Sequence, residues 1–365
     1  MDVLEPPDFS VVVITRNEER HIAACLESVS KAMRGRRYEL IVADANSTDA
    51  TAEIVGRHPA TLVRLGAGAR PTPAAGRHVG FALARGRLVL FLDGDSVLDA
   101  GWVDAALVAL EDPRLAGVAG IRESVFRPLS GAVTRRPFPQ DTTGEPELPF
   151  LGGSAVYRAS VLRAVGGWNP FLFACEEAEL GARLRARGYL LRRLPVRMTE
   201  HLTESRAETL SELWRRVRRG YPYGMGQLVR HGLTNRTLRR DQLAAVVRPL
   251  AAVLALGCAA AGLVLWLRAG RPGLALGWLG AATFTFAAFC LRAGGVRRPA
   301  YYAIEWPLTG LMILRGLLMR PRSPEEYPPP LLVDLSPAAP ARVHGATTST
   351  STSVGAASSD ELGPS

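Results

Sequence analysis

The sequence predicts an α/β fold, a mainly parallel sheet with flanking helices, followed by a transmembrane helical hairpin. Apolar runs without polar alternation recur between helical stripes up to residue 92, which is typical of parallel strands buried on both faces. Two later runs, 249–267 and 272–291, carry no charge and are each long enough to span a bilayer core. A hydrophobic fraction of 47% agrees with some membrane-embedded sequence.

Strands and helices alternate in the amino-terminal part of the chain. The apolar runs predict strands at 9–14, 38–43, 61–65 and 87–92. We expect Asn17 to cap a first helix and Gly35 to end it. Further helices are indicated by two apolar stripes, Ala52 with Val55, and Ala75 with Val79 and Leu83.

Polar segments follow three of these strands. They are TRNEE after the first strand, DANSTD after the second and DGDS after the fourth. Ligands of open parallel sheets bind beyond the carboxyl ends of the strands. We therefore expect the three segments to line one edge of the sheet and to form the functional site.

The middle of the chain is less regular. Residues 122–150 contain five prolines and predict a flexible loop over the site. A helix that closes at Gly188 is expected next, and 205–219 is expected to be an amphipathic, arginine-rich helix. The stretch GYPYGMG, 220–226, is interpreted either as an interfacial segment or as a linker.

The uncharged runs predict a membrane hairpin in preference to two core helices of a soluble domain. Arginines are more numerous at its outer ends than in its turn, so the positive-inside rule places both outer ends in the cytosol. The start of the chain, MDVLEPPDFS, lacks the basic residues and apolar core of a signal peptide, so the amino-terminal domain is expected to be cytosolic. A third apolar stretch, 299–319, could span the membrane, re-enter it or lie in the interface.

Charge and cysteine content exclude some classes of protein. A net charge of +10 and a pI near 10.1 would suit nucleic acid, anionic lipid or phosphorylated ligands. The sequence has no zinc-finger spacing or RNP-like aromatic stretch, so no nucleic-acid partner is expected. Its four scattered cysteines indicate free thiols in a reducing compartment.

One motif argues against a Rossmann oxidoreductase. LGAGAR, 65–70, begins like a dinucleotide fingerprint, but Pro71 stands where the third glycine would be required.

Asp93 and Asp95 flank Gly94 at the end of the fourth strand. Such a carboxylate pair could hold Mg²⁺ or Mn²⁺, which also bridge phosphates, and Gly94 would let both side chains converge. The alternative is a plain turn. Asp44 is interpreted either as an Asx-turn residue or as an acceptor for a ring N–H of a nucleotide base. Arg77 is either a solvated helix residue or a partner for a diphosphate.

Four segments in order carry a resemblance to a known family: VVVITRNEE, IVADANSTDAT, GRHVGFALARGRLVLFLDGD and CEEAELGARLRARGY. Over about residues 9–230 the chain resembles family-2 glycosyltransferases with the GT-A fold. The resemblance implies transfer of a sugar from a nucleotide diphosphate donor, by default a UDP-sugar, with Mg²⁺ or Mn²⁺ and inversion at the anomeric carbon. By position it implies a donor site that contains Thr15, Arg16, Glu18, Asp44, Arg77, Asp93 and Gly94.

The resemblance also implies metal ligands and a catalytic base. Asp95 and Asp93 are the implied metal residues, and His201 is a further metal candidate unless its role is structural. The family's base is usually the second residue of a Glu-Asp pair that opens a helix. Here the pair is Glu176-Glu177, so Glu177 is expected to be the base, one methylene longer than usual, with Glu176 as the alternative. A carboxylate within hydrogen-bond reach can take the proton of an acceptor hydroxyl.

The expected organisation is a catalytic domain over 1–235, a membrane region over 236–320 and a disordered, Pro/Ser/Thr/Ala-rich tail over 321–365. The expected enzyme is a multi-pass protein of the cytoplasmic membrane, and its acceptor is a lipid-linked or cell-envelope glycan. The chain has no Gln-x-x-Arg-Trp motif, which favours addition of one sugar over polymer extrusion. Two alternatives stay open: a polyprenyl-phosphate glycosyltransferase, and a nucleotide-sugar-binding membrane scaffold without turnover.

Overall fold

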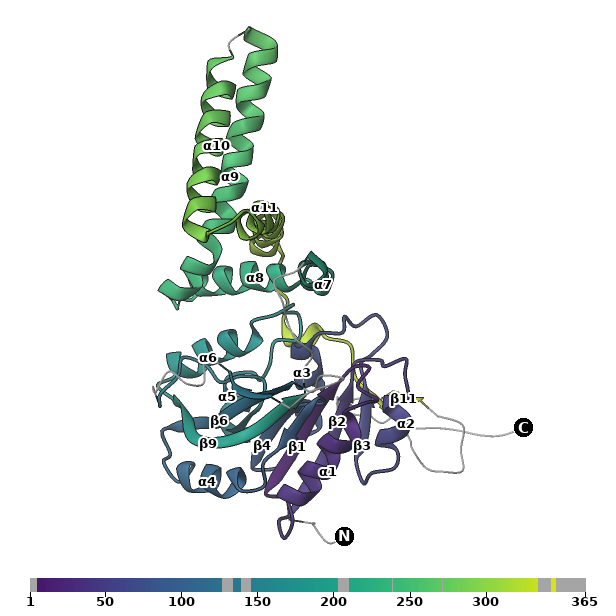
Figure 1. The fold of residues 1–365 in the computed structure, drawn as a ribbon. Coiled ribbons are helices and arrows are strands. Elements are labelled where there is room, and N and C mark those ends of the chain that lie inside the picture. The colour runs from purple at the N-terminus through teal and green to yellow at the C-terminus, as the bar shows by residue number, and fades with distance from the viewer. Residues whose placement is uncertain are drawn as a thin grey trace, which may run out of the picture.

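Three layers follow one another in the molecule: a sheet with helices on its faces, a helical platform and a projecting hairpin (Figure 1). The computed structural model describes residues 5–126, 134–138, 146–202, 210–237, 239–270, 272–333 and 343–345.

The four strands expected from the sequence form one parallel half of the sheet. They are β1 (Phe9–Thr15), β2 (Tyr38–Asp44), β3 (Thr61–Arg64) and β4 (Leu88–Asp93). Their spatial order is β3-β2-β1-β4, and all three pairings are parallel. The connecting helices are α1 (Ile22–Ala32), α2 (Thr51–Val55) and α3 (Pro73–Leu83). The interiors of β1 and β4 are buried, as continuous apolar runs require.

The first helix differs from the expectation at its start. Asn17 does not cap α1, which begins at Ile22; Asn17 has a φ of 55°, in the left-handed region that Asn tolerates better than most residues. Its N–H donates to Ser47 Oγ at 2.8 Å, and its Oδ1 accepts from the N–H of Thr48 at 2.8 Å. These bonds tie the loop after β1 to the loop after β2.

The other half of the sheet is mixed. β8 (Ala155–Arg158) pairs antiparallel with β4, and β6 (Leu115–Phe126) pairs antiparallel with β8. β9 (Leu190–Leu202) runs parallel to β6, and β5 (Ser96–Leu98) antiparallel to β9. Its helices are α4 (Trp102–Ala109), α5 (Ala159–Ala164) and α6 (Glu176–Ala186), and α6 ends just before Gly188 as expected.

The expectation of an irregular loop over 122–150 is wrong for part of that segment. Residues 122–126 complete β6, and β7 (Thr134–Pro137) pairs antiparallel with them. Pro137 stands at the last position of β7, where the missing N–H of a proline is tolerated. Residues 127–133 and 139–145 lie outside the described residues.

An aromatic cluster fixes β4 just before the predicted site. Phe91, Tyr157 and Trp168 are fully buried and meet edge to face, with ring centroids 5.3 Å apart for Phe91 and Trp168. Such pairs add about 0.5–1.5 kcal/mol each beyond the area that they bury. Asp93 therefore leaves the sheet from a strongly anchored strand.

Three helices form the platform between the sheet and the hairpin (Figure 1): α7 (Leu210–Arg219), α8 (Tyr221–Thr234) and α11 (Arg297–Leu318). α7 confirms the amphipathic helix for residues 210–219, whereas residues 203–209 lie outside the described part of the chain. The stretch 220–226 is not a linker, because residues 221–226 begin α8. Pro222 stands in the first turn, where a helix needs no N–H.

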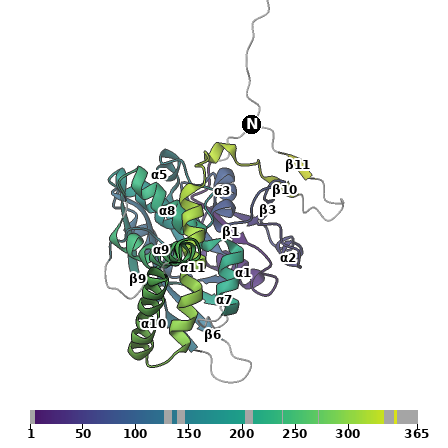
Figure 2. The ribbon, with the colours of Figure 1, turned by 90° about the horizontal axis from the view of Figure 1, so that it is seen from above.

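The hairpin consists of α9 (Arg240–Ala269) and α10 (Gly273–Ala293), which lie side by side (Figures 1 and 2). Both helices are long and apolar enough to cross a membrane. In their most apolar stretches only 6% of α9 and 0% of α10 is buried, so they are not core helices of a soluble domain. α11 does not extend this hairpin but runs across its base (Figures 1 and 2), where Gly310 packs on Pro249 of α9.

The prediction of a disordered tail from residue 321 is wrong for its first part. Residues 324–326 form a short 3₁₀ helix, and β10 (Leu331–Val333) adds an antiparallel strand to β3. β11 (Val343–Gly345) pairs with β10 in turn. Between them and α11, Tyr327 packs edge to face on Phe171 and His78. Apolar residues within the proline-rich segment thus find partners on the sheet domain, which composition alone does not reveal.

Candidate active site

Three predicted site residues stand at the carboxyl ends of neighbouring parallel strands. Thr15 is in register with Asp44, and Ile14 is in register with Asp93. The N–H of Gly94 donates to Ile14 O at 2.9 Å, which turns the chain back over β1. A Cβ at Gly94 would lie 2.9 Å from Thr15 Oγ1, so glycine permits this close approach. The sheet topology thus places Thr15, Asp44 and Asp93 at one edge, as expected.

Asp44 is fully buried and held by two neighbours. Its Oδ1 accepts hydrogen bonds from the backbone N–H (2.9 Å) and hydroxyl of Ser47, and its Oδ2 accepts from Arg64 Nε at 3.1 Å. The turn-forming role that the sequence suggested is therefore present. Both carboxylate oxygens of Asp44 are therefore engaged within the protein.

Arg16 and Glu18 lie in the loop after β1. Arg16 is exposed, and the Glu18 carboxylate pairs with His21 Nδ1 at 3.1 Å. Burial raises the pKa of the Cys25 thiol, and the charges of Asp95, Asp93 and Glu18 raise it further. Glu18 therefore contributes to the same negative field as the Asp93-Gly94-Asp95 segment, whereas Arg16 stands at the rim.

Arg77 is the centre of the carboxylate cluster. Its side chain is only 2% exposed, and its Nη2 lies 3.0 Å from Asp93 Oδ1. Its Nη1 lies 2.5 Å from Glu176 Oε1 and 3.8 Å from Glu177 Oε1. Burial lowers the pKa of Arg77, but the charges of Asp93, Glu177 and Glu176 outweigh it and raise that pKa above its ordinary value. The solvated-helix interpretation is wrong, and the guanidinium joins the end of β4 to the start of α6.

Glu176 and Glu177 open α6 but have different surroundings. The side chain of Glu176 is 5% exposed, whereas that of Glu177 is 23% exposed. Burial raises the pKa of Glu176 to about 7; the charge of Glu177 adds to the rise, and Arg77 opposes it. Cys175 precedes them with a φ of 62°, so a left-handed residue directs the chain into the helix. Of the two carboxylates, that of Glu177 is the more accessible.

Asp95 and His201 meet at the end of β9. His201 Nε2 lies 3.3 Å from Asp95 Oδ2, because β5 sets Ser96 opposite His201. A carboxylate and an imidazole that face each other suit a divalent cation such as Mn²⁺. Within the described ranges, no group of three His, Cys, Asp or Glu side chains is arranged to hold a metal. A cation here would take its remaining ligands from phosphates and water, as Mg²⁺ commonly does.

Sequence reasoning missed two residues that shape the cluster. A Cβ at Gly153 would lie 2.5 Å from Arg77 Nη2 and 2.8 Å from Asp93 Oδ2, so only glycine fits beneath this ion pair. The Arg77 guanidinium also lies over the ring of Trp168, with its carbon 5.3 Å from the centroid. The two adjacent glycines in LGGSAVYR mark this position in the sequence. The sequence alone does not show which side chains pack against them.

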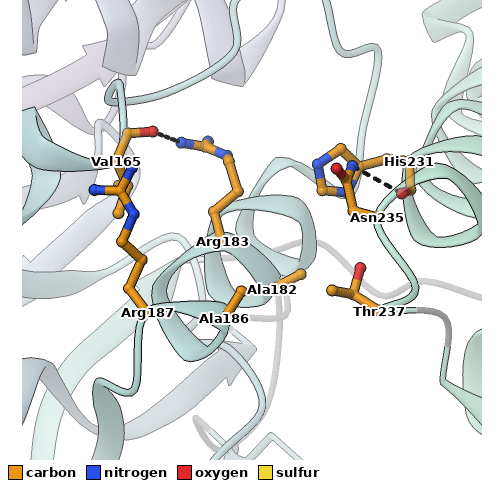
Figure 3. Close-up of a pocket in the computed structure, with 8 residues that line it drawn as sticks. All are labelled: Val165, Ala182, Arg183, Ala186, Arg187, His231, Asn235 and Thr237. Carbon is orange, nitrogen blue, oxygen red and sulfur yellow. Dashed lines mark hydrogen bonds between the residues drawn. The ribbon is translucent and has the colours of Figure 1, made fainter.

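A separate pocket of about 260 Å³ lies between α6 and the carboxyl end of α8 (Figure 3). Figure 3 shows Arg183 and Arg187 on one side and His231, Asn235 and Thr237 on the other. Arg183 Nη2 already donates hydrogen bonds to Glu179 Oε2 and to the carbonyl oxygen of Gly167, both at 2.7 Å. The residues that line this pocket include none of the predicted site residues, so the pocket lies apart from the carboxylate cluster.

Comparisons with known proteins agree with this arrangement. Residues 10–166 match the family model described as Glycosyl transferase family 2. A pre-mycofactocin glycosyltransferase of Mycobacterium tuberculosis is 28% identical over 205 residues, which cover 53% of this chain and 42% of the relative. A dodecaprenyl-phosphate galacturonate synthase of Rhizobium johnstonii is 32% identical over 129 residues, which cover 34% and 38%. The chain thus spans less than half the length of these curated relatives.

A solved structure resembles most of the chain. The mannosyltransferase PcManGT from Pyrobaculum calidifontis, in complex with GDP-Man and Mn²⁺, has a TM-score of 0.52 at 19% identity. The likeness covers 86% of this chain and 88% of that one, and it concerns the fold. The family match over residues 10–166, together with the mixed α/β sheet, shows that the chain contains a glycosyltransferase family 2 domain.

Proposed function

We propose that the protein transfers one sugar from a nucleotide diphosphate donor to a lipid-linked or cell-envelope glycan, with inversion and with a divalent cation. The observation that carries the proposal is the ionic cluster in which Arg77 joins Asp93 to Glu176 and Glu177. It sets the proposed donor edge of the sheet beside an accessible carboxylate. The GDP-Man bound to the mannosyltransferase PcManGT supports a nucleotide sugar donor without fixing the nucleotide base.

Glu177 is the proposed catalytic base. Its partly exposed carboxylate takes the proton of the acceptor hydroxyl while the acceptor oxygen bonds to the anomeric carbon. The bond from that carbon to the diphosphate oxygen breaks, and its electron pair leaves with the diphosphate. A single displacement of this kind inverts the anomeric carbon. Glu176 is buried against Arg77 and acts on the position of its neighbour rather than on the substrate.

The donor is proposed to lie across the ends of β1, β2 and β4. Thr15 and Asp44 stand where a nucleotide base would meet them, with Arg16 and Glu18 at the rim, and Asp93 with Gly94 beside the ribose. The complete burial of Arg77 supports a positioning role for it more than direct contact with the diphosphate. A divalent cation held by Asp95 and His201 would supply positive charge against the charge that develops on the diphosphate.

The membrane part of the proposal rests on α9 and α10, which are apolar and unburied. We propose that they span the cytoplasmic membrane and that the catalytic domain, about 1–235, is cytosolic. The platform would then lie at the membrane surface, with the membrane region extending to about residue 320. A tethered enzyme meets a tethered acceptor at a high local concentration.

A second candidate is transfer to a polyprenyl phosphate. The similarity to the dodecaprenyl-phosphate galacturonate synthase favours it, although that similarity covers only 34% of this chain. The chemistry at the donor would be the same, but the nucleophile would be a phosphate oxygen. Radiolabelled sugar that enters an organic extract with added polyprenyl phosphate, but not with a glycan acceptor, would favour this candidate.

The test is an assay of nucleotide diphosphate release by the purified full chain. A panel of nucleotide sugars is offered with Mn²⁺ or Mg²⁺ and membrane lipids, and Asp95→Asn is compared with the unchanged protein. Release that depends on the cation, on acceptor lipid and on Asp95 is expected. Donor binding that survives while no donor is ever turned over would instead support a scaffold.

A further inference from the structure

The segment that leads into the proposed base is held by α8. Gln227 is 6% exposed and makes two hydrogen bonds to the backbone of this segment. Its Oε1 accepts from the N–H of Phe173 at 3.1 Å, and its Nε2 donates to Phe171 O at 3.0 Å. One side chain thus fixes two peptide groups of the irregular chain just before Glu176 and Glu177.

Two glycines let α8 lie close to the same segment: Gly224 within the helix and Gly220 at its N-cap. A Cβ at Gly224 would lie 2.5 Å from Ala174 N and 2.7 Å from Ala174 O. A Cβ at Gly220 would meet the ring of Phe173. There is no room for a side chain at positions 220 and 224, so the amino-terminal part of α8 packs directly against residues 173 and 174. Cys175, in its left-handed conformation, then turns the chain directly into Glu176.

α8 is itself locked to the helices beside the hairpin. A Cβ at Gly226 would clash with Ile313 O of α11, and a Cβ at Gly316 of α11 would clash with Tyr223 O of α8. On its other side α11 meets α9, where Gly310 packs against Pro249 O. Reciprocal glycine contacts of this kind let helix backbones approach closely and resist sliding. Close backbone contacts therefore connect α9 to α11, α11 to α8, and α8 to the segment that precedes Glu177.

We propose that Gln227 and Gly224 are positioning residues for the proposed base Glu177, and that through them the membrane-proximal helices set its place in the cleft. This inference rests on the proposed function. The first turn of the helix that carries Glu177 is tied to the end of β4 through Arg77, and the contacts of α8 with residues 171–174 supply a second constraint. A misplacement of about 1 Å at a reacting group can cost on the order of 100-fold in rate.

A merely structural role of Gln227 would lower the amount of folded protein without changing the chemistry of the folded fraction. A positioning role predicts a fall in kcat with an unchanged KM for the donor, because Gln227 and Gly224 contact residues 171–174, which lead into the proposed catalytic base. It also predicts a shifted acid limb in the pH profile of kcat, because the base would sit in an altered environment.

The experiment compares Gln227→Met and Gly224→Ala with the unchanged full chain in lipid vesicles. Gln227→Met keeps the size of the side chain but removes both hydrogen bonds, and Gly224→Ala pushes on Ala174. Leu233→Ala, an exposed position on the same helix, and Gly257→Ala, which has open space around its Cβ, are the controls. Active-site titration with bound donor nucleotide gives the folded fraction of each protein.

We expect kcat per folded enzyme to fall about 10- to 100-fold in both variants, with donor KM within twofold and both controls near the unchanged protein. Equal kcat per folded enzyme in Gln227→Met and the unchanged chain would overturn the positioning role. So would a change confined to donor KM. The proposed function fails separately, if the unchanged protein turns over no nucleotide sugar at all.

Discussion

Two adjacent glutamates have opposite surroundings at the start of α6, and their substitution separates their roles. Glu177→Gln should lower kcat by about 10²–10⁴-fold with little change in donor affinity, because the amide keeps the shape of the side chain but cannot take a proton. Nucleotide diphosphate release and donor binding by calorimetry measure the two quantities. If Glu176→Gln were the more damaging of the two in kcat, the assignment of the base would be reversed.

The buried glutamate predicts a pH dependence of stability. The pKa of Glu176 rises from 4.5 to about 7 on folding, so the folded protein keeps a proton that the unfolded chain releases. The stability that Glu176 contributes is then complete below pH 4.5 and is lost as the pH rises through 7. The Tm of the unchanged protein minus that of Glu176→Gln should therefore fall between these pH values.

Thermal unfolding of both proteins at matched pH values measures this difference, and other titrating groups cancel in it. A difference that stays constant or grows with pH would mean that Arg77 holds Glu176 ionised throughout the range, since the two lie 2.5 Å apart.

Arg77 offers a prediction about the fold itself. Arg77→Ala leaves three carboxylates close together without their buried cation, and the loss of one partner from a buried ionic cluster costs about 3–5 kcal/mol. Denaturation by urea should show a decrease of that size in the free energy of unfolding. Arg57→Ala, an exposed arginine paired within its own helix region, should change stability by less than about 0.5 kcal/mol.

At the scale of elements, the carboxyl-terminal segment that contains β10 joins the sheet beside Asp44, the proposed contact for the nucleotide base. Leu331 of β10 pairs with Arg64, and Arg64 in turn holds the buried Asp44. A Cβ at Gly66 would lie 2.5 Å from Pro329 O, so Gly66→Ala should displace this segment at a cost of about 1–3 kcal/mol.

The displaced segment should become sensitive to limited proteolysis, and donor KM should rise while kcat stays near that of the unchanged protein. Gly277→Ala, which meets nothing within 4 Å, is the control. Unchanged cleavage and an unchanged KM would show that β10 does not support Asp44.

Elements whose signal is local could be predicted from the sequence, whereas those defined by a distant partner could not. β1 to β4 are continuous apolar runs that read as strands by themselves. β7 and β10 are short strands, and their identity depends on pairing with β6 and β3. The site divides in the same way. Asp93, Asp95 and the two glutamates belong to recognisable motifs, but Gly153 and Gln227 matter only for the groups that the fold brings against them.

For the whole molecule, α6 lies on the side of the sheet domain that faces the platform and the hairpin (Figure 1), and Arg77 ties the start of α6 to Asp93. α8 contacts both α6, which carries the proposed base, and α11, which crosses the hairpin. A lipid-borne acceptor would therefore approach from the side of the bilayer, and the geometry of the base would be set by the helices nearest to it.

The orientation of these layers is testable with a membrane-impermeant maleimide and single cysteines, introduced into a chain whose four native cysteines are replaced by alanine. Pro272→Cys lies in the turn of the hairpin, and Leu233→Cys lies on α8, where Leu233 is 61% exposed. In right-side-out vesicles we expect label on Pro272→Cys alone, with Leu233→Cys labelled only after permeabilisation; inverted vesicles should give the opposite pattern. The positive-inside distribution of arginines is the physical reason. Label on both positions before permeabilisation would mean that α9 and α10 do not cross the bilayer, and label on Leu233→Cys alone would place the catalytic layer outside.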